Sequence, residues 1–188
     1  MPETRITAGD FRGRLVETPR GTALRPTRSM IRQALFNVLG ERVVDARVVD
    51  MFAGAGTVGF EALSRGARAV VFVESDRGAG SLITSNARRF GCLERCRLIH
   101  ADAARWLRTE PAEVPAADIC YVDAPYRDPD IDTILELLGD RPPRLVVCEH
   151  HRARRLPERI GKLERVREIT HGLSTLTFLQ RTNDRHEQ

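Results

Sequence analysis

Long apolar runs, paired cysteines and aromatic residues are scarce in this sequence. No apolar stretch approaches the roughly 20 residues that a membrane-spanning helix needs, and the opening residues MPETRITAGD hold no apolar signal segment. We therefore expect a cytoplasmic protein that does not engage a membrane. The chain of 188 residues is long enough for one domain with a full hydrophobic core.

Cysteine usage gives no sign of a metal centre. The four cysteines, at positions 92, 96, 120 and 148, form no C-x-x-C pair, so we expect neither a zinc site nor another bound metal. Cys120 and Cys148 fall within the apolar runs DICYV and LVVCEH. We predict that both are buried and act as small hydrophobic side chains.

Positive charge is concentrated at one end of the chain. The net charge is +4, and residues 1–39 hold seven arginines against three acidic residues, whereas the remainder balances at 23 basic and 23 acidic residues. A basic segment of this kind favours contact with nucleic-acid phosphates. With only two Tyr and one Trp in the chain, we expect backbone and shape contacts to outweigh base stacking.

After residue 40, apolar strands alternate with amphipathic helices. We predict strands over 46–52, 68–74, 96–100, 118–123 and 144–150, and helices over 57–66, 76–91, 102–109 and 131–139. Uniformly apolar strands separated by helices are typical of a parallel sheet covered on both faces. Segments 162–172 and 174–182 lack a helix between them, so we expect an antiparallel hairpin at the sheet edge.

The first 40 residues differ from the rest and are predicted to form a separate basic extension. A main domain over 41–182 and a polar tail over 183–188 follow it. Two short alternating runs around Gly9-Asp10 indicate a β-hairpin, expected as an appendage of the sheet edge. Residues 25–40 have a helical pattern, with Thr27 or Ser29 as the expected N-cap.

The first predicted strand and helix are joined by Gly54-Ala-Gly56-Thr-Val-Gly59, which is a literal G-x-G-x-x-G. In a nicotinamide or flavin fold, this loop would hold a pyrophosphate at the helix N-terminus. Here Asp50 ends the strand, and a carboxylate is a poor neighbour for a pyrophosphate. It suits a ligand that carries an ammonium group. The oxidoreductase alternative therefore requires that Asp50 lie away from the ligand.

Two more acidic residues follow the next two strands. Glu74 is placed to accept hydrogen bonds from both hydroxyls of a ribose, and Asp102 could accept from an adenine amino group or cap the next helix. Ribose, adenine and a cationic amino acid together describe S-adenosylmethionine. We predict that this cofactor is bound by Asp50, Phe52, Ala53, Gly54, Gly56, Thr57, Glu74, Ser75, Asp102 and Ala103.

The fourth strand ends in DAPY, Asp123 to Tyr126. It resembles the D/N-P-P-Y motif of methyltransferases that act on exocyclic or amide nitrogens, with Ala124 in place of one proline. Asp123 and the carbonyl of Ala124 could accept the two N–H groups of an amine, while Pro125 restricts Ala124 and Tyr126 offers a ring for stacking. These four residues are the predicted catalytic group.

Asp123 favours guanine as the target base. The guanine edge presents N1–H and N2–H₂ side by side, and one carboxylate can accept both. Adenine offers a single donor group beside an acceptor, although enzymes that methylate adenine N6 can also carry Asp at this place. An adenine N6 methyltransferase on DNA or RNA therefore stays open as the alternative, as does a non-catalytic RNA-binding or ribosome-assembly protein.

Six segments resemble, in order, the RsmD-type family of bacterial 16S rRNA guanine-N2 methyltransferases: RITAGDFRGR, LRPTRSMIRQALFNVL, DMFAGAGTVGFEALSRGA, VFVE, DAPY and HGLSTLTFLQR. The resemblance covers residues 4–181. It implies an α/β, Rossmann-like class I S-adenosylmethionine-dependent methyltransferase sheet, mostly parallel, with an antiparallel C-terminal hairpin and a small N-terminal hairpin-and-helix extension. The implied reaction is methylation of N2 of guanine 966 in the small ribosomal subunit or an assembly intermediate.

Arginines near both ends of the chain are the predicted RNA contacts. An unstacked target base would reach the recessed site while these side chains track the backbone. We expect the protein to act as a monomer. The predicted RNA-binding residues are Arg5, Arg12, Arg14, Arg25, Arg28, Arg32, Arg152 and Arg154.

Overall fold

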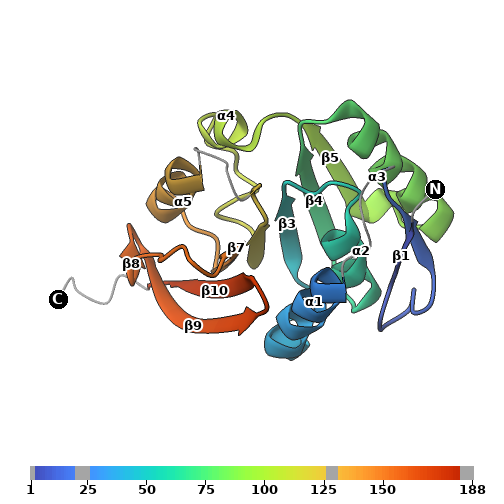
Figure 1. Ribbon diagram of the computed structural model, residues 1–188. Coiled ribbons are helices and arrows are strands. Elements are labelled where there is room, and N and C mark those ends of the chain that lie inside the picture. Colours follow the sequence, from blue (N-terminus) through green and yellow to red (C-terminus); the bar gives the residue numbers. More distant parts are fainter. Residues whose placement is uncertain (1–2, 20–25, 126–130, 183–188) are drawn as a thin grey trace.

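A computed structural model describes residues 3–19, 26–125 and 131–182, with side chains in the first helix described from Ser29 onward. Its centre is an eight-stranded sheet in the order β5-β4-β3-β6-β7-β10-β9-β8 (Figure 1). The strands are β3 (Arg47–Met51), β4 (Ala69–Glu74), β5 (Cys96–His100), β6 (Ile119–Val122), β7 (Leu145–His151), β8 (Arg159–Ile160), β9 (Leu163–His171) and β10 (Ser174–Arg181).

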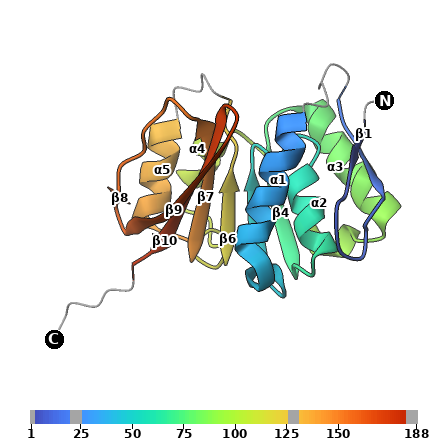
Figure 2. The ribbon, with the colours of Figure 1, turned by 60° about the horizontal axis from the view of Figure 1, so that its bottom comes forward.

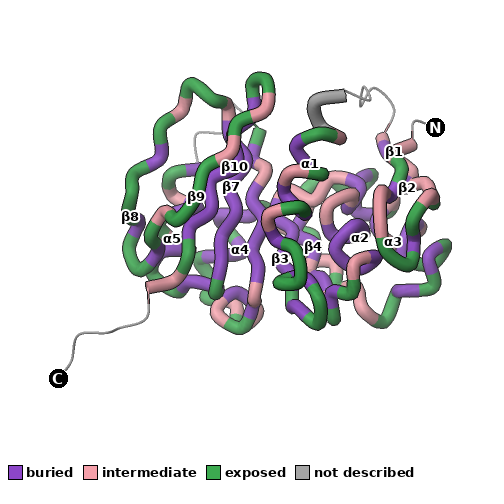
Figure 3. The backbone as a smooth tube through the Cα atoms, turned by 90° about the horizontal axis from the view of Figure 1, so that it is seen from below, coloured by how far each residue is buried: buried purple, intermediate pink, exposed green. Residues whose placement is uncertain are grey.

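Helices cover both faces of this sheet, as the alternating sequence predicts. Figure 2 shows α1, α2 and α3 on the near face, with α4 and α5 behind the sheet. Two hydrophobic clusters fill the spaces between helices and sheet, and the buried stretches of backbone run through the middle of the molecule (Figure 3). The helices are α1 (Pro26–Leu39), α2 (Thr57–Ser64), α3 (Arg77–Phe90), α4 (Ala103–Leu107) and α5 (Ile131–Asp140), with short 3₁₀ turns η1 (Gly40–Val43) and η2 (Leu93–Arg95).

The ends of α3 show how local sequence sets these elements. Asp76 caps the helix by accepting the Ala79 N–H at 2.7 Å, and Gly91 ends it with a φ of 68°.

The predicted strands and helices of the main sheet are confirmed, with bounds that differ by a few residues. Cys120 and Cys148 are buried in β6 and β7, as predicted. In the described part of the chain, no helix is long and apolar enough to cross a bilayer.

The C-terminal hairpin is confirmed. β9 pairs with β10 around a turn that includes Gly172, and β10 runs antiparallel to β7. β8 is too short, at two residues, to leave a pattern in the sequence. An antiparallel strand at the sixth position distinguishes this sheet from the nicotinamide-binding arrangement, whose order is 3-2-1-4-5-6.

The N-terminal hairpin forms as predicted but in another place. β1 (Glu3–Arg5) and β2 (Leu15–Glu17) pair antiparallel in a separate two-stranded sheet, so the expected position at the main sheet's edge is wrong. The hairpin instead packs on α2 and α3. Ser64 donates to the Ala8 carbonyl and accepts from the Phe11 N–H, while Asn86 makes two hydrogen bonds with the backbone of Glu17.

The first helix begins earlier than either predicted cap. Pro26 is its first residue, ahead of Thr27 and Ser29, so the cap prediction is wrong. Proline is favoured in the first helical turn because its missing N–H would have no partner there. Ile6, Phe11, Ile31 and Leu35 all belong to the cluster beneath α2 and α3, so the N-terminal extension shares the main core.

Candidate active site

Parallel pairing brings the two predicted loops to one edge of the sheet. Met51 of β3 is in register with Val73 of β4 and Val122 of β6. Glu74, Phe52 and Asp123 therefore follow side by side at the carboxyl ends of three adjacent strands. This is the edge at which open α/β sheets bind their ligands.

The glycines of the loop serve different purposes. A Cβ on Gly59 would lie 2.2 Å from the Phe72 ring, so this glycine lets α2 pack closely on the sheet. Gly54 has a φ of 56°, and a Cβ added there would meet nothing within 4 Å. Its missing side chain leaves open space beside half-buried backbone, which is what a ligand pressed against the loop requires. Phe52 also adopts the left-handed region, at a φ of 59°, and so sharpens the turn after β3.

Asp50 lies beneath the loop, with only 2% of its surface exposed. Its Oδ2 accepts the Gly59 N–H at 2.9 Å and so ties β3 to the first turn of α2. Burial raises the pKa of Asp50 to about 8, the Gly59 N–H opposes this rise, and the charges of Asp123 and Glu74 add to it. The charges of Asp123 and Glu74 thus disfavour ionisation of the Asp50 carboxyl.

Glu74 spans the glycine loop and the start of α3. Its Oε2 accepts the Gly54 N–H at 2.7 Å, and its Oε1 accepts the Asp76 N–H at the same distance. Each carboxylate oxygen keeps a lone pair for a further donor. Ser75 is exposed between the two, and Ala53 and Thr57 are half-buried on the loop.

Asp102 is exposed and caps α4 by accepting the Arg105 N–H at 2.8 Å. The helix-cap alternative is thus confirmed, whereas its contact with an adenine stays a prediction. Ala103, the first residue of α4, is buried.

The DAPY loop starts at the same edge. Asp123 is half-buried, Ala124 is 2% exposed and Pro125 is exposed, while Tyr126 lies outside the described residues. Directly below, the Tyr121 hydroxyl donates to Glu149 Oε2 at 2.6 Å in a buried pair that sequence reasoning missed. Its partners stand 28 residues apart in the chain, on β6 and β7, and no motif links them.

Four of the predicted RNA contacts are exposed at the outer surface: Arg5, Arg12, Arg14 and Arg152. Of these, Arg5 donates to the Gly13 carbonyl at 2.9 Å. Arg154, from the other predicted cluster, is half-buried and pairs with Asp132 at 2.6 Å. Arg5, Arg12, Arg14, Arg152 and Arg154 remain predicted contacts.

Arg14 has a structural task. Its guanidinium donates to the carbonyls of Arg89 and Phe90 at the end of α3 and lies 4.5 Å from the centre of the Phe90 ring. A cation at a helix C-terminus is stabilising, so Arg14 holds the hairpin against α3. Arg25 and the Arg28 side chain lie outside the described residues.

Arg32 is buried, with 7% of its surface exposed, which removes it from the surface that RNA could reach. Its Nη2 donates to the Arg5 carbonyl at 3.0 Å, and its Nε lies 3.7 Å from Glu61 Oε2. The prediction that Arg32 contacts RNA phosphates is therefore wrong. The net positive charge of the N-terminal segment does not reveal which of its arginine side chains are buried in the folded protein.

Glu61 is the buried counter-ion that sequence analysis missed. It is fully buried in α2, accepts the Thr7 and Ala8 N–H groups at 2.9 and 3.2 Å, and pairs with Arg65 at 2.9 Å. Thr7 and Glu61 are 54 residues apart, so only the folded chain reveals their contact. Within the described ranges, no group of His, Cys, Asp and Glu side chains is arranged to hold a metal ion.

Comparison with known proteins places this geometry in a family. A family model described as Conserved hypothetical protein 95 matches residues 4–180. YlbH of Bacillus subtilis (strain 168), provisionally named an rRNA methyltransferase, is 29% identical over 94% of this chain and 98% of its own. Ribosomal RNA small subunit methyltransferase D of Escherichia coli (strain K12) is 33% identical over 73% of this chain and 68% of its own.

Solved structures agree with this result. The Escherichia coli protein yhhF, provisionally named a methyltransferase, has a TM-score of 0.82 at 30% identity and matches 96% of this chain and 98% of its own. An RNA methyltransferase of Salinibacter ruber, solved with S-adenosyl-L-homocysteine, has a TM-score of 0.61 over 92% of this chain and 98% of its own, and its 15% identity shows the fold alone. The chain therefore belongs to the RsmD-type family of rRNA methyltransferases and has the class I S-adenosylmethionine-dependent methyltransferase fold.

Proposed function

We propose that this protein transfers a methyl group from S-adenosylmethionine to N2 of a guanine in 16S rRNA, which by family resemblance is guanine 966. The observation that carries the proposal is the register of β3 and β6. Because of this register, the DAPY loop begins directly beside the glycine loop, on one edge of the sheet. A methyl donor in one loop and an acceptor nitrogen in the other can then approach each other in line.

The residues around the glycine loop fit this cofactor. The open space at Gly54 admits a ligand against the backbone, and Glu74 can accept from the ribose hydroxyls while keeping its contact with Gly54. Asp102 is exposed and free to accept from the adenine amino group with its second oxygen. Asp50 fixes the loop through Gly59, and a cationic ligand bound above it would lower its raised pKa and favour the carboxylate, so its role is to position the loop and to pair with the cationic end once that end is bound.

The DAPY loop supplies the acceptors for the base. An exocyclic amine is a weak nucleophile because its lone pair is delocalised into the ring. Hydrogen bonds from its N–H groups to the Asp123 carboxylate and the Ala124 carbonyl hold the nitrogen with its lone pair toward the donor. The nitrogen loses a proton after transfer, and in this proposal the Asp123 carboxylate accepts it. Tyr126 stacks on the base in this proposal.

Membership of an rRNA methyltransferase family supports RNA as the substrate. Arg12 and Arg152 present exposed guanidinium groups from the hairpin and from the turn after β7, where they can contact backbone phosphates. We propose the small subunit or an assembly intermediate as the form of the rRNA that is modified, by a monomeric protein acting in the cytoplasm.

The direct test is to incubate the protein with radiolabelled methyl donor and small subunits that lack the modification, then to locate the label. Label on guanine N2 is the expected result, whereas label on adenine N6 would establish the alternative enzyme. Asp123→Ala should lose most transfer while its affinity for the cofactor, measured by calorimetry, stays near that of the wild type. Unchanged turnover would refute the role of Asp123.

A further inference from the structure

A hollow lies at the edge of the sheet opposite the proposed active site. Its volume is about 650 Å³, and its walls are the residues at which β3, β4, β6 and β7 begin. A five-residue parallel strand such as β3 spans about 16 Å, so this hollow is well separated from the DAPY loop. Nothing proposed for methyl transfer uses it.

Four arginines and two aspartates line this hollow, which makes it net positive: Arg42, Arg47, Arg68, Arg144, Asp45 and Asp118. Asp45 pairs with Arg68 at 3.5 Å, and Asp118 with Arg144 at 3.2 Å. Among the residues that the structure describes, Arg42 and Arg47 make no ion pair, and both are exposed. Because Arg68 and Arg144 are paired with the two aspartates, the side chains of Arg42 and Arg47 are available to bind an anion.

The backbone around these arginines is firmly held. The Arg47 N–H donates to Asp118 Oδ2 at 3.0 Å, and Asp45 adopts a φ of 58°, which is unusual for a residue other than glycine. The Asp45 N–H is bonded to the Gly66 carbonyl at 2.8 Å, which fixes that turn. A rigid frame lowers the entropic cost of holding a ligand.

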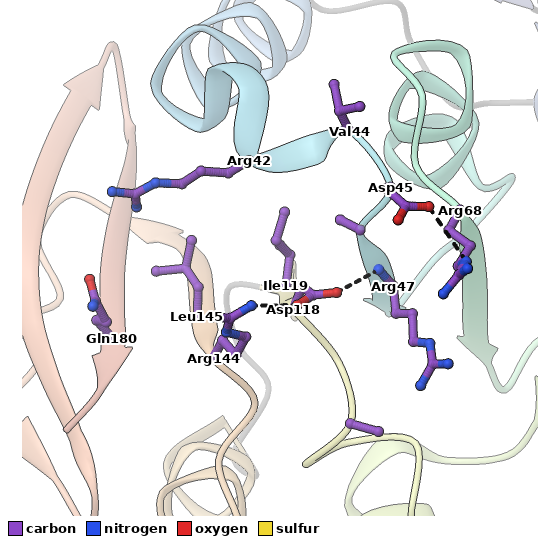
Figure 4. Close-up of a pocket in the computed structure, with 12 residues that line it drawn as sticks. Arg42, Val44, Asp45, Arg47, Arg68, Asp118, Ile119, Arg144, Leu145 and Gln180 are labelled. Atoms are coloured by element: carbon purple, nitrogen blue, oxygen red, sulfur yellow. Dashed lines mark hydrogen bonds and ion pairs between the residues drawn. The ribbon is translucent and has the colours of Figure 1, made fainter. Parts of the chain in front are cut away.

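We infer that this amino-terminal hollow binds phosphate groups of the RNA backbone, as a second contact region of the substrate. The inference rests on the proposed function for the identity of the RNA. Figure 4 shows Arg42 on one side of the hollow and Arg68 on the other, with Asp118 between them and the Arg47 guanidinium turned away from Arg42. Separated, outward-turned cations suit an extended polyanion whose charges are spaced along a chain.

A free nucleotide is the other source of phosphate, and the geometry favours it less. A compact nucleotide site brings several donors to one phosphate cluster, as glycine-rich loops and helix N-termini do. Here the guanidinium groups are spread over the rim, with Arg68 and Arg144 at 59% and 72% exposure.

The test uses two double variants. The first carries both Arg42→Gln and Arg47→Gln, and the control carries both Arg159→Gln and Arg167→Gln. The control arginines are exposed and, within the described residues, also make no ion pair, so both variants lose the same charge. Affinity for small-subunit rRNA is measured over a salt series. Each lost phosphate contact lowers the salt slope by about 1, so the first variant should lose about 2 and the control nothing. Both should retain wild-type thermal stability and cofactor affinity.

An rRNA affinity and salt slope equal to those of the control would overturn the inference. ATP binding that disappears in the first variant while rRNA binding is unchanged would also overturn it, in favour of a nucleotide. If the wild type itself neither binds nor methylates the rRNA, the proposed function is refuted, and this inference is refuted too because it depends on that function. If the wild type methylates normally and the first variant binds rRNA as the wild type does, the proposed function stands and only the second contact region is refuted.

Discussion

At the scale of single residues, the buried carboxyl of Asp50 has the clearest consequence. Its pKa lies near 8 in the folded protein, against about 3.9 in an unfolded chain. Between these two values the unfolded chain has lost the proton that the folded protein still holds. The contribution of Asp50 to stability is therefore complete below pH 4 and falls as the pH rises toward 8.

Replacing Asp50 by Asn removes this titration while keeping an oxygen for the Gly59 N–H. The stability of Asp50→Asn minus that of the wild type should therefore increase from pH 5 to pH 8, by at most about 1.4 kcal/mol per pH unit. Urea unfolding of both proteins without cofactor measures the difference. A difference that is constant over this range would show that Asp50 is ionised in the folded state.

Gly54 allows stability and binding to be separated. Gly54→Ala adds a methyl group to the open space beside the loop at a φ of 56°, so it should cost about 1 kcal/mol of stability and lower cofactor affinity strongly. Gly91→Ala is the matched control, since Gly91 has a φ of 68°, equally open surroundings and a place at the far end of α3. Calorimetric titration should show normal cofactor affinity for the control. Equal affinities in the two variants would mean that the ligand does not approach Gly54.

At the scale of elements, the contact between the hairpin and α2 depends on one buried carboxylate. Glu61 holds Thr7 and Ala8 of the hairpin loop, pairs with Arg65, and is the nearest negative charge to the buried guanidinium of Arg32. Removing one partner of a buried pair leaves the other charge uncompensated.

Glu61→Gln should therefore destabilise the protein by about 3 kcal/mol, because the buried guanidinium of Arg32 loses its counter-ion. Glu158→Gln is the control: its carboxylate pairs with Arg165 but is 89% exposed, so we expect a change within about 0.5 kcal/mol. Urea denaturation of both variants measures the effect. Equal stabilities would show that Arg32 finds another partner or water.

The elements differ in how far the sequence determines them. The β/α alternation and the helix ends at Asp76 and Gly91 depend on local chemistry, and they were predictable. The position of the hairpin depends on Ser64 and Asn86, which belong to other elements, and the hairpin's own residues carry no sign of it. The start of α1 differs from the prediction because Pro26 is favoured in the first helical turn, ahead of Thr27 and Ser29, which match the usual cap residues.

At the scale of the whole molecule, the sheet separates two edges of different chemistry. The carboxyl edge gathers acidic residues from successive strands, and this was predictable because parallel strands end together. The charged amino-terminal hollow was not, because its arginines are scattered between residues 42 and 144 and match no motif. Likewise, the excess of arginine near the N-terminus pointed to RNA contacts without showing that Arg14 and Arg32 are used in packing.

Arg12 is the most suitable residue with which to test whether the hairpin contacts RNA. It is exposed, whereas replacing Arg14 would also loosen the hairpin. Arg12→Gln should lower the salt slope of rRNA binding by about 1, with Arg167→Gln as the control on β9. A slope equal to that of the control would leave Arg12 as ordinary surface.

The short helix α2 connects the glycine loop with the N-terminal hairpin. Its first turn carries the glycine loop through Gly59 and Asp50, and its last turns carry the hairpin through Glu61 and Ser64. Thermodynamic linkage is reciprocal, so any shift of α2 on binding of nucleic acid to the hairpin alters the affinity for the methyl donor by the same factor that the donor alters the affinity for nucleic acid. Under the proposed function, nucleic acid bound to the hairpin and the methyl donor bound at the glycine loop would therefore be coupled through α2 before methyl transfer.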